Sequence, residues 1–158
     1  IASNNIDLIS KFVKENSNIY AVDSFGFHAA EIKENVSKLG VIVSIEMNEN
    51  LDKINSFGKQ LAMHIAASNP IALTSDMIQK EIINKEEELI FEELKDLGKP
   101  IEIVKKISLG KLNKFKEENS LMTQDWVMEP KKKVKDVISE LNSNGINIKE
   151  YVRLKIGE

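Results

Sequence analysis

The hydrophobic positions change period along the chain, and each change predicts a different element. Around the stretch Phe57–Pro70, apolar residues recur every three or four positions, which is typical of an amphipathic helix. Asn48 or Asn50 is a suitable cap at its start, and Pro70 ends it by disfavouring a helical Asn69. This pattern predicts a helix that packs against a core through Ile54, Phe57, Gly58, Leu61, Ala62 and Ile65.

Alternation with a period of two predicts strands before and after this helix. Ile19–Phe25 is rich in β-branched and aromatic residues, and Leu39–Met47 alternates with one buried face. Between them, His28–Lys38 is expected to be a loop or short helix that joins an antiparallel pair. The stretch Ile146–Ile156 alternates most regularly. Its predicted inward residues are Ile146, Ile148, Val152, Leu154 and Ile156, and its other face is basic.

Two long amphipathic stretches lie on either side of Gly98-Lys99-Pro100. Gly is favoured just after a helix end and Pro at a helix start, so this triplet predicts an antiparallel helical hairpin over residues 75–118. Arms of about 20 residues are about 30 Å long. Because Glu86 interrupts the apolar seam, we expect an arm packed on itself rather than a long intermolecular coiled coil.

The two ends of the chain give weaker patterns. Asn4 or Asn5 can cap a short helix that ends near Asn16. Trp126-Val127-Met128 is compatible with a strand or a packed loop, and Pro130 is expected to open a helix that stops before Gly145. Together these elements predict an α+β protein.

Composition narrows the possible partners. The 158 residues are 42% hydrophobic and 30% charged, with a net charge of −3 and interspersed charges, so neither a nucleic-acid nor a membrane partner is expected. There is no Cys, which excludes disulfides and thiolate chemistry. No glycine-rich phosphate loop occurs, so the chain is not expected to hold a nucleotide or another cofactor tightly.

His64 is the most notable polar side chain of the central helix. It lies between the apolar stripe and the polar line of Lys53 and Gln60, so its ring is expected to reach outward to a partner; an ordinary half-buried helix histidine is the alternative. No Ser or second His stands at the spacing of a triad or metal site. We therefore expect no metal and no enzyme activity, and a metal enzyme or hydrolase is the weakest hypothesis.

Several motifs resemble bacterial elongation factor Ts in order and spacing. They are Ala62–Ser68 followed by Pro70, Gly98-Lys99-Pro100, Leu112–Phe115, Val127–Pro130 and Val152–Glu158, and the resemblance runs from about Asn16 to Glu158. It implies two small antiparallel β/α subdomains, residues 1–49 and 50–158, with the hairpin inserted in the second.

The resemblance also implies a function. It suggests a guanine-nucleotide exchange factor that binds elongation factor Tu and promotes GDP release, in a bacterial cytosol or an organelle matrix. The partner-binding residues that it implies are His64, Leu39, Gly40, Val127 and Met128. For Leu39-Gly40 a bulge at the strand start is the alternative, and for Val127-Met128 and the neighbouring Trp126 the alternative is core packing.

The chain also departs from the family pattern. Ser10–Val13 only superficially resembles the family's Thr-Asp-Phe-Val motif, because Lys11 replaces the acid and the stretch lies too close to the strand at Ile19. The chain begins without Met and is expected to be a fragment that lacks the family's N-terminal helical module. Binding should therefore survive better than GDP release, and a homodimerisation or assembly module is the alternative function.

One charged run is explained by neither the exchange-factor nor the assembly hypothesis. The basic run Lys131–Lys133 occupies the expected first turn of a helix, where cations are disfavoured by a few tenths of a kcal/mol. It indicates a solvated face or a contact with an acidic partner.

Overall fold

The computed structural model describes residues 19–23, 31–33, 36–37, 39–46, 51–95, 98, 100–141 and 146–155. The helix predicted near Asn4–Asn16 lies outside them. The elements are β1 (Ile19–Asp23), β2 (Glu31–Lys33), β3 (Val36–Ser37), β4 (Leu39–Glu46), α2 (Leu51–Ser68), α3 (Lys80–Lys95), α4 (Ile101–Asn119), α5 (Val134–Leu141) and β5 (Asn147–Lys155), with short 3₁₀ turns at Ser75–Met77 and Leu121–Thr123. The predicted α+β class is confirmed.

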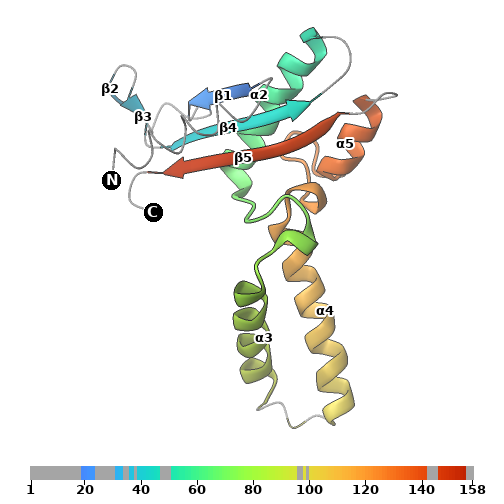
Figure 1. Cartoon of the computed structure of the whole chain (residues 1–158). Helices are drawn as coiled ribbons and strands as arrows, with labels where there is room; N and C mark the ends of the chain where they lie inside the picture. The colour runs from blue at the N-terminus through green and yellow to red at the C-terminus, as the bar shows by residue number, and fades with distance from the viewer. Residues whose placement is uncertain are drawn as a thin grey trace.

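The main sheet is antiparallel, with the strand order β1-β4-β5. Helix α2 lies across one face of this sheet, and the hairpin α3–α4 extends away from it (Figure 1). The strands β2 and β3 form a separate antiparallel pair, so the predicted loop or short helix at His28–Lys38 is wrong. Strands from both sides of residue 49 share the main sheet. The division into subdomains 1–49 and 50–158 stays a prediction.

A bulge changes the two faces of β5. Ile45 pairs with Ile148, but Val43, only two residues earlier, pairs with Tyr151, three residues later on β5. The extra residue turns Tyr151 toward the core, where its hydroxyl donates to the carbonyl oxygen of Pro70 at 2.8 Å. Burial raises the pKa of Tyr151 to about 12. The predicted single inward set on β5 is therefore wrong beyond Ile148: Val152 and Leu154 point to the other face.

The core lies between this sheet and α2. On β4 the inward residues Val41, Val43 and Ile45 are at most 1% exposed. Phe57, Leu61, Ala62 and Ile65 of the predicted stripe of α2 belong to the same core, which confirms the helix and the buried face over its described side chains. Each fully buried aliphatic side chain of this kind contributes about 1.5–3 kcal/mol. The buried members of the core are Val41, Val43, Ile45, Phe57, Leu61, Ala62, Ile65, Leu121, Trp126, Val134, Ile138 and Ile148.

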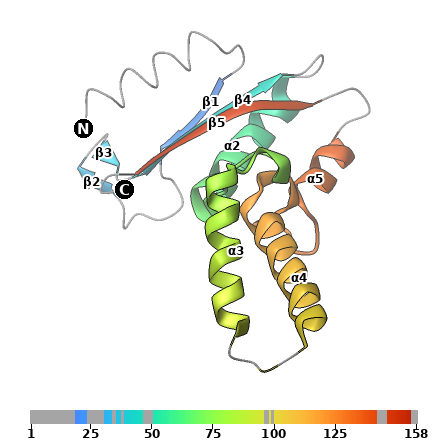
Figure 2. The ribbon, with the colours of Figure 1, turned by 60° about the horizontal axis from the view of Figure 1, so that its bottom comes forward.

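The helices α3 and α4 run side by side and are joined at their far end (Figure 2). They share a small core of their own, made of Ile90, Leu94, Val104 and Leu112. The ion pair Lys111–Glu93, at 2.6 Å, links the two arms. The connecting Gly98 has φ +59°, a left-handed conformation that favours glycine. The first arm begins at Lys80, later than predicted, because Ile78 is extended after the 3₁₀ turn.

The chain between α4 and β5 also differs from the prediction. Helix α5 begins at Val134 rather than at Pro130. Asp136 accepts a hydrogen bond from the backbone N–H of Lys133, which satisfies one of the free donors at the start of the helix. The preceding residues form a loop closed by backbone hydrogen bonds, so the strand predicted as one option at Trp126–Met128 is not present in this described segment.

Candidate partner-binding surface

His64 on α2 is fully buried, with 0% of its surface exposed. Its ring stacks on the indole of Trp126, with ring centroids 5.1 Å apart, and Trp126 stacks in turn on Phe57 at 6.0 Å. The prediction that the imidazole reaches outward is therefore wrong. The reason is tertiary: a tryptophan that is distant in sequence covers the helix border on which His64 lies. Trp126 itself is core, 3% exposed.

Both ring nitrogens of His64 have partners. The Nε2–H donates to Oε1 of Gln124 at 3.1 Å, and Nδ1 accepts from the backbone N–H of Val127 at 3.3 Å. These two roles require the neutral tautomer that carries its proton on Nε2. Burial lowers the pKa of His64 below its ordinary value of 6.5, and the hydrogen bond to Gln124 offsets part of this effect. The ring is thus a neutral connector between α2 and the loop after α4.

The residues that follow Trp126 form an exposed loop on this buried base. Val127 is 46% exposed and Met128 is 40% exposed, so the alternative that both pack in the core is wrong. The loop is closed by Trp126 N–H donating to the Lys132 carbonyl at 2.7 Å and by Glu129 N–H donating to the Trp126 carbonyl at 3.0 Å. We call residues 126–132 the contact loop. It presents two adjacent apolar side chains on a backbone that is fixed from several sides.

The lysines after Pro130 are mostly used within the molecule. Lys132 lies 3.1 Å from a carboxylate oxygen of Glu129 and 2.8 Å from one of Glu140, and hydrogen bonds to both carboxylates raise its pKa. Lys133 donates to the backbone carbonyl of Thr123 at 2.8 Å. Two of the three lysines therefore brace the contact loop against α5 and the 3₁₀ turn at Leu121–Thr123.

Leu39 and Gly40 lie at the start of β4, and both are half-buried. Gly40 pairs in continuous register with Asp23 and Leu154, so the predicted alternative of a bulge at this point is wrong. Among the residues that the structure describes, a Cβ atom at Gly40 would meet nothing within 4 Å, so no described side chain blocks approach to the backbone there. The hydrogen bonds and ring contacts given above join His64 to Val127; among the described residues they join neither of them to Leu39 or Gly40.

Gln124 is a central residue of this site that the sequence analysis did not single out. It is 6% exposed and hydrogen bonds to His64, Ser68 and Glu118. The signal available in the sequence was an amide side chain within the mostly apolar stretch Leu121–Met128. Such a signal is weak, because only the fold shows whether the amide is buried.

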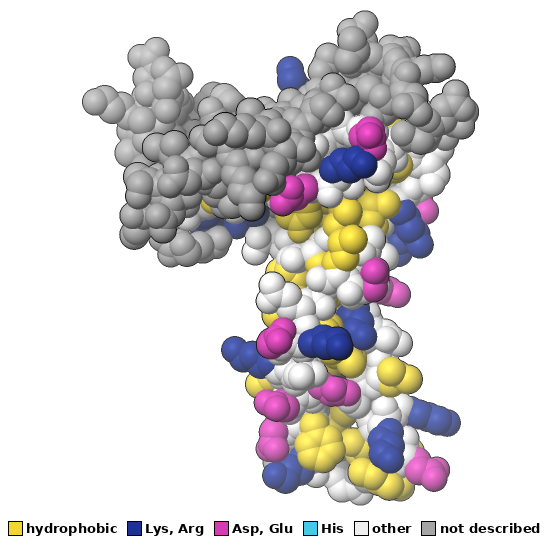
Figure 3. Space-filling view, in the orientation of Figure 1, with side chains coloured by type: hydrophobic (Ala, Val, Ile, Leu, Met, Phe, Trp, Pro, Cys, Tyr) yellow, Lys and Arg dark blue, Asp and Glu magenta, His cyan; other side chains and the backbone are white. Residues whose placement is uncertain are grey.

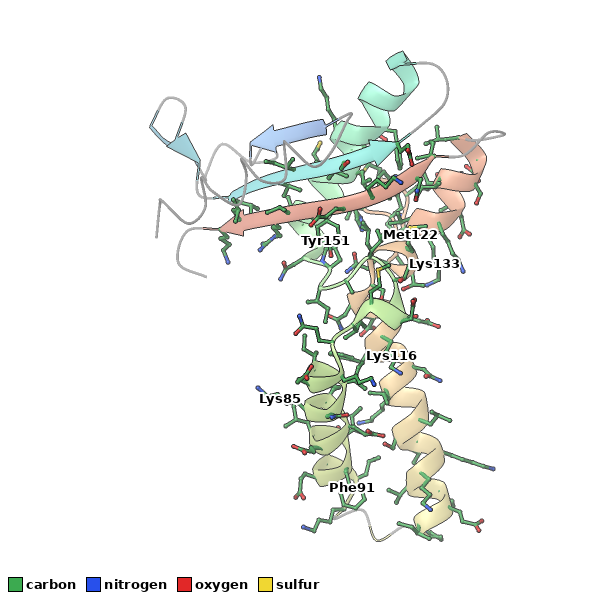
Figure 4. All side chains as sticks on the ribbon, in the orientation of Figure 1. Lys85, Phe91, Lys116, Met122, Lys133 and Tyr151 are labelled. Atoms are coloured by element: carbon green, nitrogen blue, oxygen red, sulfur yellow. The ribbon has the colours of Figure 1, made fainter. Side chains whose placement is uncertain are left out.

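The wider surface offers little other chemistry. In the ranges that the structure describes, no three His, Asp or Glu side chains gather as a metal site would require, and no helix is long and apolar enough to cross a membrane. Met122 and Lys133 lie where the hairpin meets the sheet layer, with Tyr151 on the neighbouring strand β5 (Figure 4). The contact loop thus lies next to the junction between the hairpin and the sheet.

Comparison with known proteins identifies the family. The family model described as "Elongation factor TS" matches residues 4–158. Elongation factor Ts from Zymomonas mobilis is 35% identical over 131 residues, 81% of this chain and 43% of the relative. The proteins of the same name from Sphingopyxis alaskensis and Ehrlichia ruminantium are 37% and 36% identical, over 78% and 80% of this chain. The chain spans less than half the length of these relatives, 41% and 45% for the last two. It belongs to the elongation factor Ts family.

Proposed function

We propose that this chain acts in translation elongation by binding the GTPase elongation factor Tu and promoting the release of GDP. The observation that carries the proposal is the contact loop, where Val127 and Met128 are exposed at the positions that match the family's Val-Met pair. Exposed Met is an adaptable apolar contact. Exchange of this kind requires only that the factor bind the nucleotide-free GTPase more tightly than the nucleotide-bound form.

The five sequence-predicted site residues take different roles in this proposal. Val127 and Met128 contact the partner directly, and Leu39-Gly40 forms a second contact where the open backbone allows close approach. His64 is a positioning residue, because its buried ring reaches the partner only through the Val127 N–H that it holds. Since no stretch matches Thr-Asp-Phe-Val, we expect binding to be retained better than acceleration of GDP release.

Release of fluorescent GDP from elongation factor Tu tests the proposal directly. The 158-residue chain should raise the release rate above that of buffer, and Zymomonas mobilis elongation factor Ts serves as the positive control. Met128→Asp should weaken binding at least tenfold, because it places a charge in an apolar contact. Met77→Asp is the matched control, since Met77 is an exposed methionine, 60% exposed, outside the contact loop.

Two results contradict the proposal. One is a chain that neither binds the GTPase nor changes its GDP release while the relative does both. The other is an equal loss of binding in the two Asp variants, which would show that the contact loop has no special part. Measuring binding by titration beside the release rate separates a factor that binds without exchange from one that does neither.

A second candidate function, self-association, is supported by a groove along the hairpin. The groove has a volume of about 820 Å³ and its apolar wall includes Phe91, Ile101 and Leu109, which are 50%, 59% and 61% exposed. Hydrophobic side chains gather at the far end of the hairpin (Figure 3). On the α3 side the groove carries Glu87, Glu88 and Glu92, and on the α4 side Lys105. A second copy that places its α4 over this α3 would pair opposite charges on both sides of a two-fold interface.

Charge reversal tests this second function by sedimentation over a concentration series. Glu88→Lys and Lys105→Glu should each weaken the homodimer, and an equimolar mixture of the two variants should form a heterodimer with both contacts complementary. Leu109→Lys should also dissociate it, whereas Leu89→Lys, at a leucine 59% exposed outside the groove, should not. A wild-type chain that stays monomeric at every concentration, or variants that do not reassociate when mixed, would reject the groove as a dimer interface.

A further inference from the structure

The amide of Gln124 has no free hydrogen-bonding group. Its Nε2 donates to the carbonyl of Ser68 at 3.2 Å and to that of Glu118 at 2.8 Å, while Oε1 accepts from His64. Two carbonyl acceptors can face only the NH₂ group of the amide, so the oxygen must face the imidazole. This orientation forces the proton of His64 onto Nε2 and leaves Nδ1 as the acceptor for the Val127 N–H.

The two carbonyls belong to helix ends. Ser68 is the last residue of α2, and Glu118 lies in the last turn of α4. Carbonyl groups in the last turn of a helix have no partner within the helix, so an external donor is needed when they are buried. The backbone of Gln124 also accepts from the Val134 N–H at 3.1 Å, at the start of α5. One residue therefore fixes the ends of three helices relative to one another.

A continuous chain of contacts runs from the hairpin to the exposed loop. It passes from the Glu118 carbonyl through the Gln124 amide and the His64 ring to the Val127 N–H, in steps of 2.8, 3.1 and 3.3 Å. The aromatic stack on Trp126 holds the ring in the plane that these bonds need. A shift of the end of α4 would therefore move Oε1 of Gln124, the acceptor that sets the tautomer of His64, and with it the backbone of the contact loop.

We infer that Gln124 is a positioning residue that couples the end of the hairpin to the contact loop, so that the affinity of the loop for its partner depends on the placement of α4. The inference rests on the proposed function for the partner, a GTPase, but the coupling is a property of this chain alone. Gln124 touches no partner itself, since it is buried beneath the loop.

Gln124→Met tests this coupling, because methionine has a similar shape but neither donates nor accepts at these positions. Two readouts are needed. The first is the ¹⁵N spectrum of the His64 ring together with solvent exchange of the Val127 amide. The second is the concentration of the chain that gives half-maximal GDP release from elongation factor Tu. We expect loss of the single Nε2–H tautomer, faster exchange of the Val127 amide, and a rise of about tenfold in the half-maximal concentration.

Tyr151→Phe is the matched control. It removes the hydrogen bond from a side chain to the Pro70 carbonyl just after α2, whereas Gln124→Met removes two bonds to helix-end carbonyls and the bond to His64; Tyr151 lies outside the path to Val127. It should lower the melting temperature while changing the half-maximal concentration less than twofold. If Gln124 had a merely structural role, the half-maximal concentration would change in proportion to the loss of melting temperature, and in the same proportion in both variants.

The outcomes separate the two proposals. If wild type does not bind the GTPase, the proposed function fails, and the ring spectrum and Val127 exchange still decide the coupling. If wild type binds and Gln124→Met matches it in half-maximal concentration, ring spectrum and exchange rate, the coupling is overturned. Should Gln124→Met fail to fold, His64→Phe cuts the same path one residue later, keeps the ring stack, and should give the same loss of protection at Val127.

Discussion

At the scale of single residues, the site depends on polar groups that are buried and fully paired. His64 and Gln124 are 0% and 6% exposed, and each uses every hydrogen-bonding atom of its side chain that can pair within the protein. Removing one member of such a set leaves the others without partners, and each buried unpaired group lowers the free energy of unfolding by about 1–3 kcal/mol. The exposed residues of the contact loop, by contrast, can change with little cost to the fold.

The burial of His64 predicts a pH dependence of stability. Its pKa in the folded chain is lowered, so the unfolded chain takes up a proton first as the pH falls below about 6.5. The stabilisation is complete above the unfolded pKa and is lost as the pH falls toward the folded pKa. We expect the free energy of unfolding to decrease between pH 7.5 and pH 5.5, by at most about 1.4 kcal/mol per pH unit.

Urea unfolding at a series of pH values measures this effect. In the control His64→Phe, the decrease over this range should be absent, although the variant is less stable at every pH. Glu46 also has a lowered pKa, owing to its hydrogen bond and ion pair with Lys149, but its contribution is lost only at more acid pH. An identical pH profile for wild type and His64→Phe would contradict the prediction.

At the scale of elements, local patterns predicted the long helices and strands well. The helix α2, with its stripe, and the strands β1, β4 and β5 follow from periodicity and propensity, because their residues repeat the geometry of the element itself. Two features escaped prediction for a common reason. The bulge in β5 and the burial of His64 are both decided by a partner that is distant in sequence: β4 for the bulge and Trp126 for the histidine.

Two glycines of the hairpin, Gly98 and Gly110, are predicted to respond to alanine substitution with stability changes of opposite sign. Gly98 has φ +59°, a left-handed conformation that is unfavourable for any residue with a Cβ atom. Gly98→Ala should therefore lower the free energy of unfolding by about 1–2 kcal/mol. Gly110 lies inside α4, and a Cβ there would meet nothing within 4 Å, so Gly110→Ala should raise stability by about 0.5–1 kcal/mol. Thermal unfolding followed by circular dichroism measures both; shifts of the same sign would contradict the assigned conformations.

At the scale of the whole molecule, the main sheet joins residues from both predicted subdomains. The central strand β4 pairs with β1 on one side and β5 on the other, and its inward side chains form one wall of the core under α2. The resemblance and the periodicity gave the elements and their order. The predicted antiparallel pairing of the first two strands is confirmed as β1 with β4. The pairing of β4 with β5 was not predicted, because it closes a chain segment of about 100 residues and does not depend on local sequence.

This arrangement predicts the behaviour of the second predicted subdomain alone. A chain of residues 50–158 lacks β1 and β4, so β5 has no partner and α2 loses Val41, Val43 and Ile45. We expect helical circular dichroism from the hairpin but no cooperative unfolding transition, monitored by the fluorescence of Trp126. The full 158-residue chain is the control. A sigmoidal transition of similar steepness in the shorter chain would support the division at residue 49 instead.

Within the described part of the chain, the hairpin joins the sheet layer at one end and extends away from it, so a small rotation at that end is amplified at the far end (Figure 1). With 19 residues, α4 is about 28 Å long, so a rotation of about 5° at its root displaces its far end by about 2.5 Å. Conversely, a molecule that binds at the far end can displace the root of the hairpin, where Gln124 holds the end of α4. A molecule that binds near Phe91 and Ile101, at the far end, would then shift the contact loop at Met128 through Gln124 and His64.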